Sequence, residues 1–324
     1  MKYRRRQFLL ESTSLAVSYA LLGQRIFHQS AGSNQTKKGT RIILLGTKGG
    51  PRVGETSSTN PGRHNPSTVI LINDVPYVVD CGYGCSRQLL AAGVGLDKLR
   101  YLFITHHHSD HNLEYGPLLY NAWITGRPVK VDAYGPVGLD KITRDFFEYA
   151  KFDIEIRIVD EGRQDPRKLV KVHEFSGPGV ILENDDVKIS ACRVRHPPIK
   201  EAYAYRFDAG DLSVVISGDT AYAPELIQFA KGADVLVHEV MYLPAVEELV
   251  KRLPNAKRLR EHLMVSHTLP ADVGRIAAAA GVKTVVLTHF VPGDDPSITD
   301  EQWAADVRKH FTGRVIVGKD LMEI

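Results

Sequence analysis

Short apolar and β-branched runs alternate with segments rich in Gly, Pro, Asn and Ser from residue 41 to the C-terminus. Runs of this length, bounded by turn-forming residues, are typical of buried β-strands. The pattern predicts strands over residues 41–46, 68–74, 76–82, 101–105, 129–136, 187–196, 212–220, 233–240, 283–290 and 314–318. It also predicts helices over 85–99, where a turn follows the helix, over 118–126 and over 270–282.

Strands and helices alternate in both halves of this region, so each half is predicted to form a sheet covered by helices. We therefore expect an α/β protein with a four-layer αββα sandwich, in one domain that spans residues 41–324. The last helix has clear ends, because Pro270 suits a first helical turn and Gly281 suits a helix end.

The first 31 residues follow a different pattern, which is that of an export signal. The basic sequence "RRR" at residues 4–6 precedes a weakly apolar run that ends at Gly23, as in a signal peptide. Residues 5–9, "RRQFL", resemble the twin-arginine signal of bacterial export, although Arg4 and Glu11 depart from its pattern. We expect an export signal at 1–31, a linker at 32–40 and a periplasmic or secreted protein. A disordered basic tail is the alternative.

The composition is that of a soluble globular protein, with 43% hydrophobic and 24% charged residues among 324. The chain has no run of 18 apolar residues, so no stable membrane span is predicted. Removal of residues 1–31 would lower the net charge from +3 to −1, because that segment holds five basic residues and one acidic residue. A basic face for nucleic acid is therefore not expected.

The segment "FITHHHSDHNLEYG" at 103–116 follows a predicted buried strand and concentrates four histidines around Asp110. A single His at a strand end is more often a structural residue than a ligand. Several imidazoles and a carboxylate in one turn are costly to desolvate, and a cation offsets this cost. Other predicted strands also end in ionisable residues, namely His196, Asp219, Glu239 and His289. The sequence therefore predicts a metal site that these strand ends share.

The pattern His106-x-His108-x-Asp110-His111 matches the HxHxDH signature of the metallo-β-lactamase superfamily of hydrolases, and the resemblance extends from about residue 41 to the C-terminus. It implies the αββα fold of that superfamily and two divalent ions, with zinc expected and manganese or iron as alternatives. The implied ligands are His106, His108 and His196 for the first ion, Asp110, His111 and His289 for the second, and Asp219 for both. The resemblance also implies that Asp80 orients ligands from behind and that His107 points away from the ions.

Within the superfamily the sequence is similar to the tRNase Z branch. The segments that resemble it include "RHNPS" at 63–67, "HEVMY" at 238–242 and "SHTLPADVGRIAAAAGVKTVVLTH" at 266–289. This likeness implies that His267 and Glu239 form a pair near the ions, where His267 contacts a substrate oxygen or protonates the leaving oxygen. The residues to which we assign a catalytic role are Asp110, His267 and Glu239.

Residues near the ligands in sequence are candidates for substrate contact. We assign substrate binding to Asn65, Tyr115 and Tyr222. Trp123 and Tyr203 are further candidates for a wall that binds an aryl group, and core packing is the alternative for the aromatic residues. His238 is expected to be structural and His262 to lie on the surface.

The predicted function is that of an exported dinuclear hydrolase that cleaves phosphodiester or aryl sulfate esters with a hydroxide bridging the two ions. Export would separate the enzyme from cytoplasmic RNA, and residues 137–195 contain no long Gly- and Lys-rich arm like the one by which the tRNase Z branch holds its RNA. We therefore expect a small-molecule ester as partner, no nucleic acid, and a homodimer. The alternatives are a β-lactam or lactone hydrolase and a metal-binding protein without hydrolytic activity.

Overall fold

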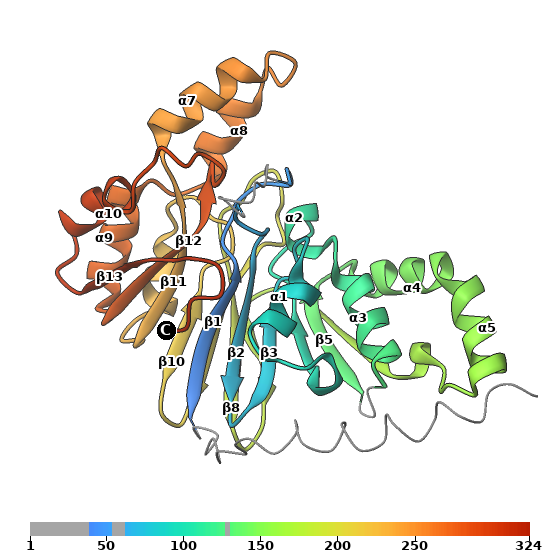
Figure 1. Ribbon diagram of the computed structural model, residues 1–324. Helices are drawn as coiled ribbons and strands as arrows, with labels where there is room; N and C mark the ends of the chain where they lie inside the picture. Colours follow the sequence, from blue (N-terminus) through green and yellow to red (C-terminus); the bar gives the residue numbers. More distant parts are fainter. Residues whose placement is uncertain (1–38, 54–61, 127–129) are drawn as a thin grey trace, which may run out of the picture. The chain divides into compact units, whose positions relative to one another are not determined.

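Two β-sheets lie face to face at the centre of the domain (Figure 1). The computed structural model describes residues 39–53, 62–126 and 130–324. The predicted export signal at 1–31 lies outside these residues, as does most of the predicted linker at 32–40. No helix in the described ranges is long and apolar enough to cross a membrane.

The first sheet starts as an antiparallel meander and continues with parallel strands. Strands β1, β2 and β3 are antiparallel neighbours, and β3 to β6 are parallel neighbours. Asn73 and Asp74 adopt positive φ between β2 and β3, the backbone that a tight hairpin turn requires and that Asn and Asp tolerate. The strands are β1 Thr40–Gly46, β2 Ser67–Ile72, β3 Val75–Val79, β4 Tyr101–Phe103, β5 Val131–Pro136 and β6 Val170–Phe175.

The second sheet places several strands in one direction. Strands β7 to β10 are antiparallel neighbours, and β10 to β13 are parallel neighbours. Strands β8, β10, β11 and β12 therefore point the same way, and their C-terminal ends meet at one edge of the sheet. The strands are β7 Gly179–Glu183, β8 Val187–Arg193, β9 Tyr203–Ala209, β10 Ser213–Ile216, β11 Val235–Met241, β12 Thr284–Val291 and β13 Arg314–Val317.

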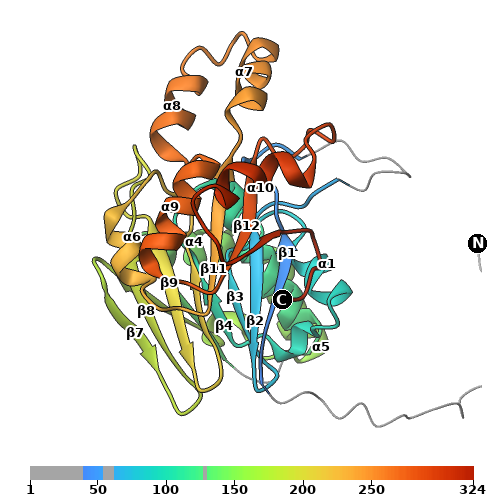
Figure 2. The ribbon, with the colours of Figure 1, turned by 90° about the vertical axis from the view of Figure 1, so that its left-hand side faces the viewer.

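Helices cover the outer face of each sheet, which completes the four layers. Helices α1, α3 and α4 pack on the first sheet, and α6, α9 and α10 pack on the second (Figures 1 and 2). The helices are α1 Cys85–Ala91, α2 Ser109–Asn112, α3 Tyr115–Ile124, α4 Leu139–Tyr149, α5 Lys151–Glu161, α6 Pro224–Phe229, α7 Leu243–Arg252, α8 Leu259–Ser266, α9 Pro270–Ala280 and α10 Asp300–Arg308. The predicted αββα sandwich is confirmed.

The core between the two sheets is rich in aromatic residues. Phe103 stacks on Tyr134 with ring centroids 5.1 Å apart, and the edge of Phe207 meets Phe103 at 5.5 Å. Such pairs stabilise a core by about 0.5–1.5 kcal/mol each beyond the burial of their surface. The aromatic core thus holds the strand ends of the two sheets in a defined position relative to one another.

The structure contains elements that the hydrophobic pattern did not predict. Strands β6 and β7 mix polar and apolar residues because each lies at an edge of its sheet, and α4 and α5 carry many charged residues. Helices α7 and α8 form a hairpin that projects beyond the C-terminal ends of β11 and β12 (Figures 1 and 2). This α7–α8 hairpin bounds one side of the candidate site.

Candidate metal centre

The predicted ligands lie at strand ends that the topology brings together. His106 and His108 follow β4, and Asp110 and His111 lie in the short helix α2. On the second sheet, His196 and Asp219 lie after β8 and β10, and His289 lies near the end of β12. All seven predicted ligands fall into two adjoining groups whose candidate ligand atoms lie within 4.8 Å of one another in each group.

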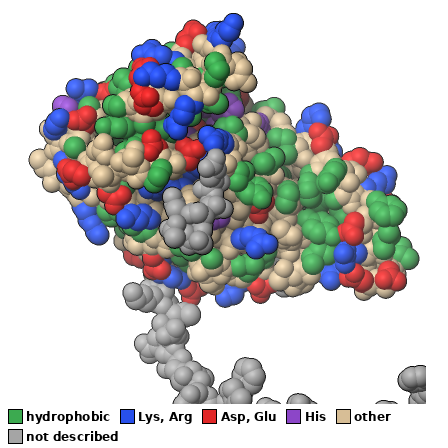
Figure 3. Space-filling view, turned by 45° about the horizontal axis from the view of Figure 1, so that its top comes forward, with side chains coloured by type: hydrophobic (Ala, Val, Ile, Leu, Met, Phe, Trp, Pro, Cys, Tyr) green, Lys and Arg blue, Asp and Glu red, His purple; other side chains and the backbone are tan. Residues whose placement is uncertain are grey.

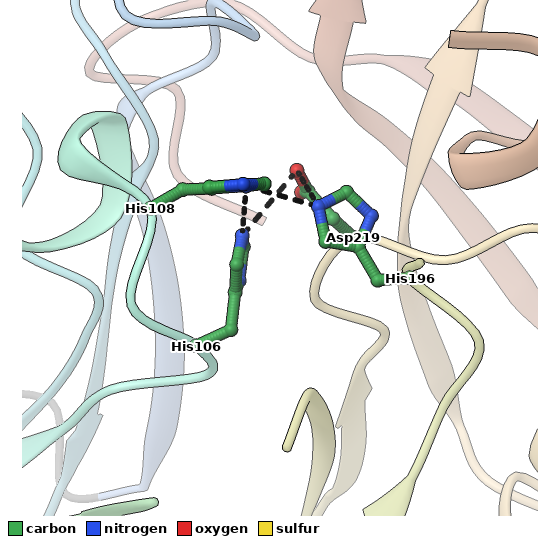
Figure 4. Close-up of side chains that lie close together, drawn as sticks. All are labelled: His106, His108, His196 and Asp219. Carbon is green, nitrogen blue, oxygen red and sulfur yellow. Dashed lines mark hydrogen bonds and ion pairs between the residues drawn. The ribbon is translucent and has the colours of Figure 1, made fainter. Parts of the chain in front are cut away.

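The first group contains His106, His108 and His196, with Asp219 at its side (Figure 4). His108 Nδ1 lies 3.0 Å from Nε2 of both His106 and His196. The Oδ2 atom of Asp219 lies 3.8 Å from the same two Nε2 atoms. A tetrahedral zinc ion with nitrogen ligands at about 2.0–2.1 Å separates those ligands by roughly 3.4 Å. The spacing of the first group therefore fits one such ion.

The second group contains Asp110, His111 and His289, and it shares Asp219 with the first. Asp219 Oδ1 lies 3.2 Å from His111 Nε2 and 3.1 Å from His289 Nε2. Asp110 Oδ2 lies 3.6 Å and 3.5 Å from the same two nitrogens. The two oxygens of Asp219 thus face different groups, which is the arrangement of a carboxylate that bridges two ions.

Unpartnered polar atoms give a further test of whether ions fit here. His111 Nε2, His289 Nε2 and Asp219 Oδ1 are buried and have no hydrogen-bond partner in the described residues. Buried polar atoms are normally paired, because an unpaired one carries the full cost of its desolvation. A cation held by these atoms would remove that cost. The two groups therefore suit a dinuclear metal site, with the donor types that zinc, iron or manganese accept.

The two groups differ in the protonation of their histidines. Burial lowers the pKa of His106 and His196, and lowers that of His108 to about 4. In the second group burial also acts to lower the pKa, but the nearby carboxylates outweigh it. Asp219 raises the pKa of His111 well above its usual value and that of His289 to about 10. In the absence of an ion, protonated His111 and His289 therefore supply the positive charge that balances the carboxylates of the second group.

Asp80 fixes His111 from behind the centre. Asp80 Oδ2 lies 2.7 Å from His111 Nδ1, and the amide of Thr105 donates to Asp80 Oδ1 at 2.8 Å. Asp80 has a positive φ of 61°, a backbone that non-glycine residues seldom adopt except where surrounding contacts hold it. The carboxylate thereby orients His111 so that Nε2 faces the centre.

His267 and Glu239 form the predicted pair beside the ligands. His267 Nδ1 lies 3.0 Å from Glu239 Oε1, which also accepts a hydrogen bond from the amide of Thr220 at 3.0 Å. Burial lowers the pKa of His267, but the Glu239 carboxylate outweighs burial and raises it. The rings of His267 and His289 stack with centroids 5.5 Å apart. An imidazole whose pKa is raised by its carboxylate partner is thus held at the edge of the second group.

A cavity of about 460 Å³ opens beside the two groups. His108, Asp110, Asp219, His267 and His289 line it on the metal side, and Lys48, Arg52 and Asp294 also line it. The α7–α8 hairpin forms the opposite wall. The hairpin residues of this wall are Leu249, Leu253, Ala256, Leu259, His262 and Leu263. The cavity size is within the range of small-molecule and nucleotide sites.

The structure separates the predicted substrate-binding residues from this cavity. Asn65 is buried and donates to the carbonyl oxygen of Gly50 at 2.7 Å, so it holds a cavity-lining loop in place. Tyr115 is fully buried in the core, where its hydroxyl lies 2.9 Å from Thr143 Oγ1. Tyr222 is exposed and does not line the cavity. Direct substrate contact by Tyr115 and Tyr222 is therefore not supported by their positions.

For Trp123 and Tyr203, the positions agree with the core-packing alternative and not with an aryl-binding wall. Trp123 packs in a small core cluster and donates from Nε1 to the carbonyl oxygen of Gln164 at 2.8 Å. Tyr203 is buried between the sheets. Both side chains pack into the core because their strand or helix faces it, and proximity in sequence to a ligand does not change that.

Three other histidines have distinct positions. His107 Nε2 lies 3.2 Å from the carbonyl oxygen of Pro136, outside both ligand groups. His238 is buried on β11, with Nδ1 2.6 Å from the carbonyl oxygen of Glu239. His262, expected on the surface, is half-buried on α8 and lines the cavity. Its apolar neighbours at Leu259 and Leu263 follow a helical spacing that could have indicated an inward face.

Comparison with known proteins identifies the family. Residues 76–290 match the model of the beta-lactamase superfamily domain. Ribonuclease Z of Mycobacterium bovis (strain BCG / Pasteur 1173P2) is 32% identical over 286 residues, which cover 87% of this chain and 97% of the relative. Ribonuclease Z of Mycobacterium avium (strain 104) has the same identity and coverage.

Solved structures show the same fold at lower sequence identity. The short form of human tRNase Z superposes with a TM-score of 0.62 at 19% identity and covers 88% of this chain and 98% of that one. The metallo-beta-lactamase fold protein YhfI from Bacillus subtilis gives a TM-score of 0.62 at 20% identity, with the same coverage.

These relatives correct two predictions. The expectation that nucleic acid is not a partner is wrong, because the curated relatives are ribonucleases. The periplasmic or secreted location is contradicted by the same relatives, which are ribonuclease Z proteins, and the predicted twin-arginine signal lies outside the described residues. The phosphodiesterase part of the predicted activity is supported, and the arylsulfatase part is not.

The family match, the fold and the two ligand groups agree with one another. The protein is a metal-dependent hydrolase with the metallo-β-lactamase fold, and its His and Asp clusters suit two metal ions. The chain belongs to the beta-lactamase superfamily, together with its ribonuclease Z relatives.

Proposed function

We propose that the protein is a dinuclear metal-dependent phosphodiesterase that cleaves RNA. The observation that carries this proposal is the pair of ligand groups around Asp219, because each gathers three or more His and Asp ligand atoms within 4.8 Å and several of these buried atoms make no hydrogen bond. The ribonuclease Z relatives at 32% identity indicate RNA as the phosphodiester. We further propose tRNA transcripts as the RNA class, since a tRNase Z shares the fold.

The residues of the chain have separable roles in this proposal. His106, His108 and His196 would hold the first ion, and Asp110, His111 and His289 would hold the second, with Asp219 between them. Bound ions would supply Lewis acidity and lower the pKa of water at the phosphate. Gly50 donates its amide to Asp110 Oδ2 at 2.9 Å, which fixes that carboxylate toward the second group.

His267 is placed to give a proton to the leaving oxygen. Its Nδ1 edge is occupied by Glu239, so its other edge is free to meet the substrate in the cavity that His267 lines. The Glu239 carboxylate raises the pKa of His267 and so favours the imidazolium form that a general acid needs. Protonation of the leaving ribose oxygen avoids the release of a strongly basic alkoxide.

The test is cleavage of RNA by the purified full-length protein in the presence of zinc or manganese. We expect metal-dependent cleavage of a tRNA transcript that carries additional nucleotides at both ends, with about two ions per chain by elemental analysis. A chelator should abolish cleavage, and added metal should restore it. Cleavage that persists without metal, or the absence of RNA cleavage by protein that holds two ions and hydrolyses bis(4-nitrophenyl) phosphate, would contradict the proposal.

A further inference from the structure

The α7–α8 hairpin differs from the rest of the domain in charge. Between residues 243 and 266 it holds five basic and three acidic side chains, whereas residues 39–324 together hold 34 basic and 37 acidic ones. The basic residues of the hairpin are Lys251, Arg252, Lys257, Arg258 and Arg260, and all are exposed. Figure 3 shows Lys and Arg side chains over this part of the surface. A projection with excess positive charge on an otherwise acidic domain suits a polyanion.

The inner face of the same hairpin is apolar and faces the metal centre. Leu249, Leu253, Ala256 and Leu259 are half-buried and line the cavity of about 460 Å³, and Leu263 beside them is buried. The cavity is also lined by the ligand groups and by Lys48, Arg52 and Asp294. The hairpin side of the cavity is therefore mainly aliphatic, with His262 among its residues, and the rest of the lining carries Lys48, the Arg52–Asp294 pair and the candidate metal ligands.

A second, shallow hollow lies at the basic tip of the hairpin. It is lined by Asn255, Ala256, Lys257, Arg258, Leu259 and His262. Three of these residues, Ala256, Leu259 and His262, also line the cavity beside the ligand groups. The two hollows therefore adjoin through these three residues, so Lys257 and Arg258 at the tip lie next to residues that also line the cavity beside the ligand groups.

We propose that the α7–α8 hairpin is the element that holds the RNA strand at the metal centre. Its aliphatic face contacts the base of a nucleotide next to the scissile phosphate, and its basic tip contacts phosphates further along the strand. A base has two apolar faces, which an aliphatic wall can cover while the polar edge of the base points to the cavity mouth. This inference rests on the proposed RNA phosphodiesterase function and names the part of the chain that selects a single-stranded segment.

The charge arm of the test uses the double variant K257Q/R258Q. The matched control is K141Q/R144Q on α4, which also removes two exposed cations that pair with acidic neighbours on their own helix. We expect the hairpin variant to weaken RNA binding severalfold and to reduce the slope of log Kd against log salt by about 0.7 for each lost phosphate contact. The control should match the wild type, and both variants should hydrolyse bis(4-nitrophenyl) phosphate at the wild-type rate.

The base arm uses Leu253→Asn, which places a polar group in the aliphatic wall at the end of α7. We expect about a tenfold loss in kcat/KM on intact RNA and little further loss on RNA with an abasic nucleotide beside the cleavage site. Val265→Asn on α8 is the control, because Val265 is exposed and does not line the cavity. The wild type should itself lose activity on RNA that has the abasic nucleotide on one side of the cleavage site. An abasic nucleotide on the other side should have little effect.

The outcomes separate this inference from the proposed function. If the wild type cleaves RNA and both hairpin variants behave as their controls do, the hairpin does not hold the RNA and the inference is wrong while the proposed function stands. If the wild type holds two ions and cleaves no RNA, the proposed function fails and the inference fails with it. Loss of activity by Leu253→Asn on every substrate, with a lowered melting temperature, would show damage to the fold and also count against a role in base contact.

Discussion

The two ligand groups of the centre use similar residues, but the pKa values of their histidines are shifted in opposite directions. In the first group, three imidazoles lie around a space with one carboxylate at its side, and burial keeps those imidazoles neutral by lowering the pKa of each. In the second group, Asp110 and Asp219 meet His111 and His289, and the carboxylates hold protons on both imidazoles. The first group presents lone pairs at neutral pH, whereas the second must release protons before an ion can bind.

This difference follows from where the acidic side chains come from. Asp80 and Asp110 both lie within 4 Å of imidazole nitrogens of the second group, from the end of β3 and from α2, while Asp219 is the carboxylate at 3.8 Å from the first group. Excess carboxylate in a buried place requires positive charge, which a divalent ion or two imidazolium groups can supply. We therefore expect the two ions to bind with different dependence on pH and on the residues behind the ligands.

The largest effect is expected from Asp219→Asn, because Asp219 is the residue that the two groups share. The amide removes the bridging charge, and we expect the variant to lose both ions and at least about 10³-fold in kcat/KM, beyond the roughly 10–100-fold typical of residues behind a ligand. Metal content and RNA cleavage would be measured together. Asp208→Asn on β9 is the control. A variant that still holds two ions would show that the groups do not depend on a common ligand.

The second-largest effect is expected from His267→Ala, which separates metal binding from catalysis. His267→Ala removes a side chain that neither group needs, so we expect two ions per chain and a loss of about 10²–10⁴-fold in kcat. Because Glu239 raises the pKa of His267, activity that needs the imidazolium should persist above the usual His range and fall as pH rises through the raised value. Glu239→Gln should move that fall to lower pH. His107→Ala is the control, and loss of metal in His267→Ala would contradict this division of roles.

Asp80→Asn should affect the second group more than the first. The carboxylate lies 2.7 Å from His111 Nδ1, and loss of such a partner typically lowers metal affinity by about 10–100-fold. Competition with a chelator would measure the two binding constants. Asp132→Asn is a matched control, because Asp132 Oδ1 also lies 2.7 Å from a histidine, His173 Nε2, away from the centre. Equal losses at both sites would indicate that Asp80 acts on the whole centre.

The sequence predicted the centre better than it predicted the surroundings of the centre. Strand runs such as 101–105 and 283–290 are almost wholly apolar, and a ligand follows the first directly (His106) and lies near the end of the second (His289). Local sequence is sufficient when the ladder of a sheet determines the position of a side chain. The fold and the presence of a metal site were therefore accessible from the sequence pattern, whereas the grouping of the ligands around two ions came from the resemblance to the metallo-β-lactamase superfamily.

The walls of the cavity were not accessible in the same way. Tyr115 is only four residues from His111 in sequence, which favours substrate contact, yet α3 turns Tyr115 into the core. His262 lies in a charged segment that favours a surface position, yet α8 turns it toward the ligands. Which face of a helix meets a site depends on how the helix packs. The amphipathic pattern of residues 243–266 predicts an apolar face but does not identify the part of the protein that this face contacts.

The smallest effect concerns pH, and it tests directly whether the two ligand groups differ in protonation before metal binds. The pKa of His289 is raised to about 10 in the metal-free protein, so binding of the second ion at pH 7 must displace protons from His289 and His111. Its affinity should rise by about tenfold per pH unit for each proton displaced. The first ion meets imidazoles of lowered pKa, including His108 at about 4, and its affinity should be nearly constant above about pH 6.

Calorimetry in two buffers of different protonation enthalpy measures the protons released by each ion. Release should accompany the second ion and be close to zero for the first. His289→Gln provides the sharpest check, because the amide cannot hold a proton, and it should reduce the release on second-ion binding by about one proton. Equal release by both ions would mean that the two groups carry the same charge before metal binds, and that the carboxylates around the second group do not hold its protons in place.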